Sequence, residues 1–199
     1  MVQTPAQLIT LKEFLRRPET KPASEYADGQ VIQKPMPQGQ HSRLQQKLMS
    51  TINAVTEDAQ IALALPELRC TFGGRSIVPD VAVFQWDRLP VNEDGSIANS
   101  FNAQPDWTIE ILSPDHSSTR VISNILHCLE HGCRLGWLID PGERLVQIYH
   151  PEQRPLSLEL PEEHLPTPAF APALQLDLAT LFGWLQLRQT ARSRGLDSG

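Results

Sequence analysis

A proline inside a β-branched segment is the feature that most constrains this chain. Residues 76–84 read Ser-Ile-Val-Pro-Asp-Val-Ala-Val-Phe, which is rich in the branched and aromatic side chains typical of strands. Because Pro79 cannot donate a hydrogen bond to a strand ladder, it belongs at an edge or a bend. The segment therefore predicts an extended stretch that bends beside Asp80, and the bend is a way to aim that carboxylate into a cleft.

The other patterns predict a mixture of strands and helices. An Asp-Gly pair favours a tight hairpin over residues 26–33. Apolar residues at intervals of three and four predict a long helix over 41–56 and another over 119–131. Strands are predicted at 68–72, 107–112, 135–139 and 145–149, a polar loop at 89–104, a proline-rich connection at 151–172, short terminal helices at 8–15 and 174–187, and a frayed tail at 188–199. Strands with a helix on each side form an α+β or mixed α/β layer.

Length and charge limit the classes of function. A chain of 199 residues, 40% of them hydrophobic, suits a single domain over 1–199 with a real core. Its formal net charge of −6 argues against non-specific binding to DNA through a broad basic face, although a local basic strip stays compatible with it.

The cysteines and apolar runs point to the cytoplasm. Three cysteines, Cys70, Cys128 and Cys133, do not describe a disulfide framework in a chain of this size. The longest apolar run, around residues 61–65, is far below the ~20 residues that a membrane-spanning helix needs. The first eleven residues lack the pattern of a secretory signal. We therefore expect a cytoplasmic protein with no membrane partner.

Two acids fall on neighbouring predicted strands. Asp80 lies at the bend and Glu110 lies within the strand at 107–112. Mg²⁺ prefers hard oxygen ligands and keeps several waters, so one or two carboxylates with a substrate phosphate can hold it. The backbone carbonyl of Ile111 would complete the ligand set. Taken alone, the same pair also fits a solvated sheet edge.

Three successive motifs resemble those of one family. Residues 78–83 (Val-Pro-Asp-Val-Ala-Val), 105–114 (Pro-Asp-Trp-Thr-Ile-Glu-Ile-Leu-Ser-Pro) and 136–141 (Gly-Trp-Leu-Ile-Asp-Pro) look like motifs of the Uma-type family of putative restriction endonucleases, a branch of the PD-(D/E)XK superfamily. The resemblance implies a restriction-endonuclease-like α/β (α+β) fold. Its mixed central sheet would be flanked by helices, with a nuclease-like core over 24–149 that includes the N-terminal hairpin, and a C-terminal helical extension over 151–199.

The resemblance also implies an activity. It suggests an endonuclease that hydrolyses phosphodiester bonds of nucleic acid, expected to be DNA, with Mg²⁺ or Mn²⁺ bound by Asp80 and Glu110. Glu25 and His41 would face the same cleft. Glu25 would ligate metal or orient water, or else be a surface carboxylate. His41 would contact phosphate or shuttle a proton, or else only begin its helix. By analogy with nucleases that pair two sites, we expect a homodimer.

The expected basic residue is missing where the family places it. The superfamily pattern has lysine two residues after the second acid, and this chain has Leu112 there. In the Uma-type family the lysine lies on the following helix, fourteen residues after Glu110, where this chain has Asn124. Asparagine has a dipole but no charge, so turnover would be weakened or lost.

Other cations offer a rescue. Arg120 lies one helical turn before position 124 on a similar face, and Lys34 or Lys47 could enter from elsewhere. Arginine can stabilise phosphate charge but cannot act as a base. Two hypotheses therefore remain, a weakened endonuclease and a catalytically inactive remnant that binds nucleic acid or a protein partner.

A third hypothesis comes from another motif. His127-Cys128-Leu129-Glu130-His131 spells H-x-x-E-H, a signature of zinc metallopeptidases, and two histidines at i and i+4 share a helix face. Gly132 is predicted to end the helix directly after His131, and no third ligand is evident. Surface histidines and half-buried cysteines are the favoured interpretation of this segment.

Overall fold

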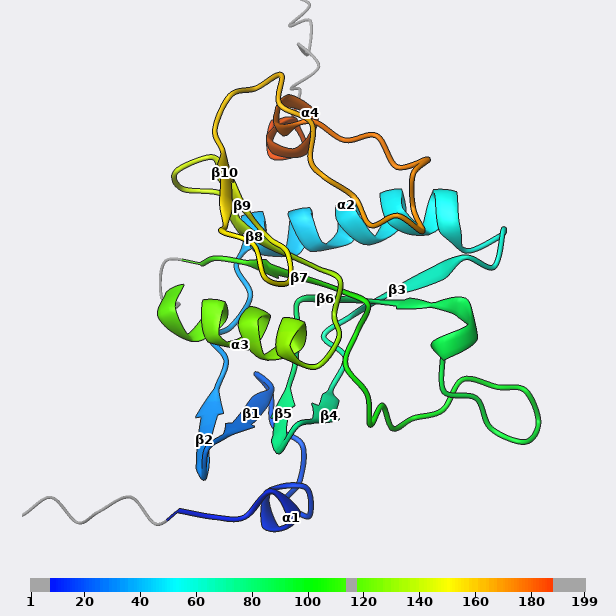
Figure 1. The fold of residues 1–199 in the computed structure, drawn as a ribbon. Coiled ribbons are helices and arrows are strands. Elements are labelled where there is room, and N and C mark those ends of the chain that lie inside the picture. Colours follow the sequence, from blue (N-terminus) through cyan, green and yellow to red (C-terminus); the bar gives the residue numbers. More distant parts are fainter. Residues whose placement is uncertain (1–7, 114–117, 188–199) are drawn as a thin grey trace, which may run out of the picture.

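The computed structural model describes residues 8–113 and 118–187, arranged around a large mixed sheet. Its strand order is β10 (Leu156–Leu158), β9 (Leu145–Tyr149), β8 (Leu135–Asp140), β7 (Trp107–Ile111), β6 (Val81–Gln85) and β3 (Ala62–Pro66). Strands β7 and β8 are parallel, and each other neighbouring pair of this sheet is antiparallel. Helix α2 (Gly39–Thr56) covers one face, and helix α3 (Ser118–Glu130), which connects β7 to β8, covers the other (Figure 1).

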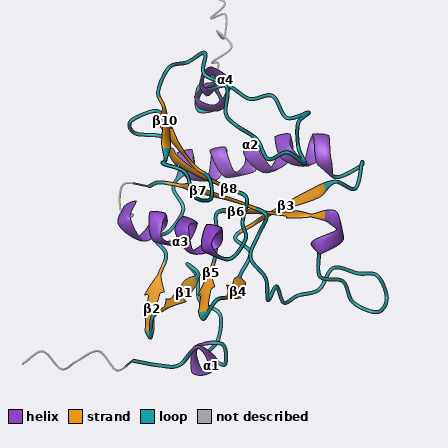
Figure 2. Ribbon diagram, viewed as in Figure 1, coloured by secondary structure: helices purple, strands orange, loops and turns teal. Residues whose placement is uncertain are grey.

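A small antiparallel sheet lies beyond α3 (Figure 2). Its order is β2 (Gln30–Gln33), β1 (Ser24–Ala27), β5 (Arg75–Ile77) and β4 (Cys70–Phe72). A short helix, α1 (Leu11–Phe14), packs Phe14 against Tyr26 of β1, with ring centroids 5.6 Å apart. A single 3₁₀ turn, η1 (Trp86–Arg88), follows β6, and α4 (Leu178–Gly183) is the last helix described.

The main core lies between α2 and the large sheet. Leu44, Leu48 and Ile52 are buried on the inner face of α2, as their spacing predicts. They meet the two fully buried tryptophans Trp107 and Trp137, whose rings contact edge to face at 4.6 Å. Side chains from the segment after β9, including those of α4, pack into the same core. Burial of this apolar surface fixes α2, and with it the first turn of that helix, against β6 and β7.

Most predicted elements are confirmed, and one is wrong in an informative way. The hairpin, both long helices and the strands at 68–72, 107–112, 135–139 and 145–149 are present, with boundaries shifted by a few residues. The single bent segment at 76–84 is instead two strands, β5 and β6, in different sheets. The ladder stops at Pro79 because proline has no N–H to donate.

Smaller differences have local causes. Strands β3 and β10 were not predicted, because one is a short apolar run and the other lies in a proline-rich connection. Helix α4 is shorter than the predicted 174–187, since Asp177 caps it by accepting a hydrogen bond from the backbone N–H of Thr180 at 2.7 Å. The predicted tail at 188–199 lies outside the described residues. Within residues 8–113 and 118–187, no helix combines the length and apolar character needed to cross a bilayer.

The packing of α3 on β8 leads to a stability prediction. A Cβ at Gly136 would collide with the branching methyl, Cγ2, of Ile125 on α3. Gly136→Ala should therefore lower the free energy of unfolding by about 1–3 kcal/mol, measured by urea denaturation. Ile125→Leu, which removes that methyl, should restore part of the loss in the double variant. The control Gly183→Ala meets nothing within 4 Å and should be neutral or slightly stabilising.

Candidate functional site

Asp80 and Glu110 face the same point from adjacent strands. The β6–β7 ladder pairs Val81 with Ile109, so the next step places Asp80 opposite Glu110, and directly opposed residues share a face. Both side chains are only 2% exposed. The Nζ of Lys34 lies 2.7 Å from Oδ1 of Asp80 and 3.6 Å from Oε2 of Glu110. The structure therefore places the two acids around one buried positive charge, the ammonium group of Lys34.

Lys34 reaches this point from the small sheet. It directly follows β2, and its backbone N–H donates to the carbonyl of Ala23 at 2.8 Å, which fixes the start of the side chain. Its Nζ also donates to the carbonyl of Val78 at 2.7 Å. Of the two lysines named from the sequence as able to enter from elsewhere, Lys34 is the one at the acids.

Several groups hold the Asp80 carboxylate in place. His41, in the first turn of α2, puts Nε2 at 3.0 Å from Oδ2 of Asp80. The same oxygen accepts the backbone N–H of Ile111 at 2.8 Å, and Gln45 donates to the backbone carbonyl of Asp80 at 2.8 Å. The N–H of Ile111 is thus engaged with Asp80, while the metal-binding role expected for its carbonyl stays a prediction.

Glu25 and Asn124 form a second buried pair beside the acids. Glu25, on β1, is 4% exposed, so the interpretation of it as a surface carboxylate is wrong. One of its oxygens accepts the N–H of Val78 at 2.8 Å, and the other accepts the amide of Asn124 at 2.9 Å. The position where the resemblance predicted a lysine is therefore close to the site, but here the side chain at that position, Asn124, binds Glu25.

The remaining sequence candidates lie outside this cluster. Arg120 on α3 and Lys47 on α2 are half-buried. Within residues 8–113 and 118–187, neither forms an ion pair with Asp80 or Glu110. Leu112 follows β7 directly and lines the neighbouring cavity instead. The expectation that Arg120 supplies the missing charge therefore has no contact to support it.

The electrostatics of the cluster separate the two acids. Burial alone would raise the pKa of Asp80, but Lys34 and His41 outweigh it and hold that pKa well below its ordinary value. Burial raises the pKa of Glu110 well above its ordinary value, and the charges of Asp80 and Glu25 add to this effect against the opposing Lys34. Burial lowers the pKa of Lys34, but the neighbouring carboxylates overcome this and raise it. These shifts in pKa favour the ionised form of Asp80, the protonated form of Glu110 and the charged form of Lys34.

The donor set fits a hard divalent cation. Asp80 and Glu110 offer carboxylate oxygens at one point, and the Oε1 atom of Glu110 is buried without a hydrogen-bond partner among the described residues. Carboxylate oxygens are what Mg²⁺ and Mn²⁺ prefer. A bound cation would give the orphan oxygen a partner and stabilise the ionised form of Glu110.

Two hollows give access to the cluster. A small pocket of about 40 Å³ has Lys34, His41, Asp80 and Ser113 in its lining. A larger cavity of about 660 Å³ shares His41 and Ser113 with it and extends over the start of α2 and the turn after β8. His41 therefore stands where a substrate in the larger cavity would meet the acids.

Fold and site together define a restriction-endonuclease-like protein with a buried acidic pair. The model of the Uma2 family, described as "Putative restriction endonuclease", matches residues 11–179, and the chain belongs to this family. A crystal structure of a putative nuclease belonging to DUF820 from Anabaena variabilis ATCC 29413 is 56% identical, with a TM-score of 0.89. That match covers 89% of this chain and 99% of the other. None of the curated protein sequences matches significantly.

The burial of the side chains in and beside the H-x-x-E-H segment differs in part from the prediction. Cys128 and Cys133 are fully buried rather than half-buried, and burial raises the pKa of both thiols, that of Cys133 to about 12. His127 is buried as well, whereas His131 is exposed as predicted. Helix α3 ends at Glu130, one residue before the predicted end.

Glu110 gives a stability prediction with a definite sign. Because its pKa is higher in the folded chain, the unfolded chain releases this proton first as pH rises above ~4.3. The free energy of unfolding of the metal-free protein should therefore fall as pH rises above ~4.3, where the lowered pKa of Asp80 keeps that group ionised. Glu110→Gln should flatten this fall in urea denaturation series, while Glu143→Gln, at an exposed position, should not. Equal slopes in wild type and Glu110→Gln would contradict the assignment.

Proposed function

We propose that this protein is a metal-dependent endonuclease that hydrolyses phosphodiester bonds of DNA, with Asp80 and Glu110 as its ligands for Mg²⁺ or Mn²⁺. One observation carries the proposal. The chain lacks lysine at both positions where the fold family uses it, and yet the ammonium of Lys34 lies at both acids. The charge that phosphoryl chemistry needs is therefore present, supplied from the hairpin of the small sheet instead of from α3.

The role of Lys34 follows from its environment. Its raised pKa keeps it charged at neutral pH, so it cannot accept a proton as a general base. Its contribution is electrostatic, because a fixed positive charge in a buried site stabilises negative charge developing on a phosphate. The bound cation would supply Lewis-acid polarisation of the phosphate and a water of lowered pKa.

The other polar residues act as positioning groups. His41 and the N–H of Ile111 fix Oδ2 of Asp80, which leaves the orientation of this carboxylate little freedom. Asn124 and the N–H of Val78 fix Glu25, whose charge reaches both Lys34 and Glu110. A carboxylate held from several sides is preorganised for a cation, which lowers the entropy lost on binding.

The expected substrate and assembly follow from charge and symmetry. With a net charge of −6, DNA would be attracted locally, at the cavity next to His41, rather than by a broad basic surface. Since one site cuts one strand, a homodimer with two sites is the arrangement we propose for cutting both strands.

The inactive remnant is the second candidate, and one observation favours it. Lys34 already makes a 2.7 Å hydrogen bond to Asp80, so its ammonium competes with a metal ion for the same oxygen. If the ammonium is a permanent counterion, the fold would bind nucleic acid or a protein partner without cutting. The two candidates differ in whether Lys34 moves aside when a cation binds.

Plasmid nicking separates these candidates. We expect slow nicking of supercoiled plasmid that is faster with Mn²⁺ than with Mg²⁺. Asp80→Asn and Glu110→Gln should each reduce the rate by at least ~100-fold, because each removes a charged metal ligand. Lys34→Met should cause a loss of similar size. Lys47→Met, on α2 and without an ion pair to the acids, is the matched control and should keep the wild-type rate.

The opposite outcomes are equally specific. Nicking that survives both Asp80→Asn and Glu110→Gln would refute this site. Retention of nicking in Lys34→Met would show that Lys34 is dispensable for cleavage. DNA binding without nicking, followed by gain of cleavage in Asn124→Lys, would establish the remnant, because restoring the family's lysine would then restore the chemistry.

A further inference from the structure

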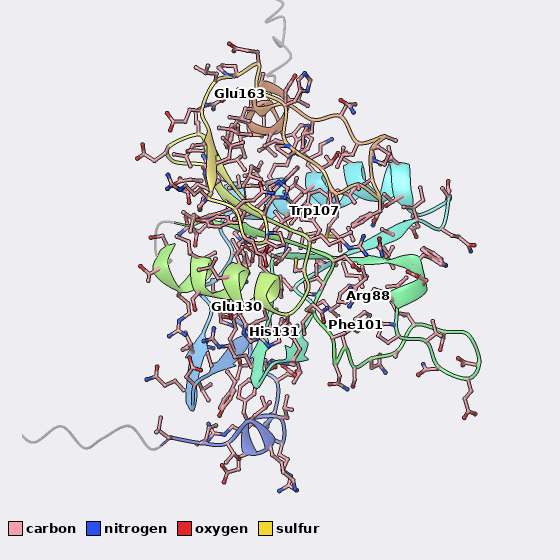
Figure 3. The ribbon with its side chains drawn as sticks, in the orientation of Figure 1. Arg88, Phe101, Trp107, Glu130, His131 and Glu163 are labelled. Carbon is pink, nitrogen blue, oxygen red and sulfur yellow. The ribbon has the colours of Figure 1, made fainter. Side chains whose placement is uncertain are left out.

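A second cluster of metal-ligating side chains lies at the end of α3. The ligand atoms of His127, Glu130 and His131 all lie within 4.8 Å of one another. Figure 3 shows Glu130 and His131 on the side of α3 that faces the small sheet. None of these residues takes part in the Asp80–Glu110 cluster, so this group has no role in the proposed nuclease activity.

Backbone carbonyls fix the tautomer of both histidines. Nε2 of His127 lies 3.2 Å from the carbonyl oxygen of Phe72, and Nδ1 of His131 lies 2.8 Å from the carbonyl oxygen of His127. A carbonyl only accepts hydrogen bonds, so these two nitrogens carry the hydrogens. Nδ1 of His127 and Nε2 of His131 therefore keep free lone pairs. A metal-binding histidine is typically held in this way by a hydrogen bond on its other nitrogen.

The turn between β4 and β5 shapes the space for these rings. Phe72 stacks on His127 with centroids 4.8 Å apart, and it meets His131 edge-on at 5.5 Å. Gly73 has φ of +54° in this turn, and a Cβ there would collide with Nε2 of His131. Glycine at this position therefore leaves room beside Nε2 of His131, one of the two imidazole nitrogens that are free to bind.

We propose that His127, Glu130 and His131 bind one transition-metal ion of the Zn²⁺ class. Two neutral imidazoles and one carboxylate are a common zinc donor set, with water as the fourth ligand. Metal–ligand bonds of ~2.0–2.2 Å require the ligand atoms to approach more closely than 4.8 Å. Glu130 is exposed and can rotate inward, whereas His127 is buried and the ring of His131 is held by the carbonyl of His127.

The local charges are compatible with a bound cation. Burial lowers the pKa of His127, which favours the neutral imidazole that a metal needs. The nearby cation Arg75 is already engaged, since it pairs with Asp28 at 2.9 Å and bonds to Ser123 at 3.2 Å. The charge of Glu130 would offset half that of a divalent ion. The buried thiols of Cys128 and Cys133 are not part of this cluster.

Zinc titration of metal-free protein without an affinity tag tests this site. Competition with a chromophoric chelator should show that the wild-type protein binds one equivalent of Zn²⁺ at this site. His131→Ala and Glu130→Gln should each reduce the affinity for that equivalent at least ~10-fold. His164→Ala, an exposed histidine elsewhere, and Asp80→Asn, which removes the other candidate site, should keep wild-type affinity. Gly73→Ala should weaken binding without removing a ligand. Near-UV circular dichroism checks that each variant is folded.

Cobalt substitution identifies the ligand atoms. Co²⁺ bound by imidazole and carboxylate should give visible d–d bands without the near-ultraviolet charge-transfer band of a thiolate. Absence of a bound equivalent, unchanged affinity in His131→Ala, or a thiolate band would each overturn the proposal. These measurements involve neither DNA nor cleavage, so their result is independent of the nuclease assignment.

Discussion

The ion pair between Lys34 and Asp80 is the interaction on which the rest of the site depends. Burying a charged carboxylate is costly unless it is paired and hydrogen-bonded, and here the pairing is complete. Lys34 and His41 meet the two oxygens of Asp80 and outweigh the burial that would otherwise raise the pKa of this group. Glu110 lacks such a partner for one oxygen, and burial raises its pKa well above the ordinary value. The cluster thus favours the ionised form of Asp80 and the protonated form of Glu110, and a bound cation would favour ionisation of Glu110 as well.

The same contacts join the two sheets. Between β5 and β6 the ladder is broken at Pro79, so the backbone of Val78 needs other partners. Its N–H is accepted by Glu25, and its carbonyl accepts from Lys34. Both side chains come from the N-terminal hairpin of the small sheet, and both face the acids of the large sheet. The side chains that form the candidate site therefore also satisfy the backbone where the strand changes sheets, which is why a bend and a site coincide at this point.

Sequence reasoning located the acids but left the cation open between Arg120, Lys34 and Lys47, and the reason is physical. Asp80 and Glu110 lie at a strand bend and on a strand, features that local pattern reveals, and the register then brings them together. Lys34 contacts Asp80 across 46 positions of sequence, and its reach depends on how the hairpin docks, which no local pattern encodes. Counting along the chain correctly placed Asn124 near the site, but its contact with Glu25 depends on the buried position of β1. Arg120 was named as one possible source of charge because helical spacing predicts which face of a helix a residue lies on, but it does not predict which residue it contacts.

What matters for the chemistry of a buried site is the position of the charged group, and not the helix or strand from which its side chain comes. The resemblance predicted a lysine on α3, whereas here the ammonium comes from the hairpin of the small sheet, and α3 contributes the neutral amide of Asn124. The two arrangements are not equivalent in flexibility. A lysine anchored beside β2 also bonds the carbonyl of Val78, so moving it away from Asp80 breaks a contact between the sheets as well as an ion pair. Entry of a metal ion at this site would therefore be coupled to the junction between the sheets, because it would require the ammonium of Lys34 to leave both Asp80 and the carbonyl of Val78.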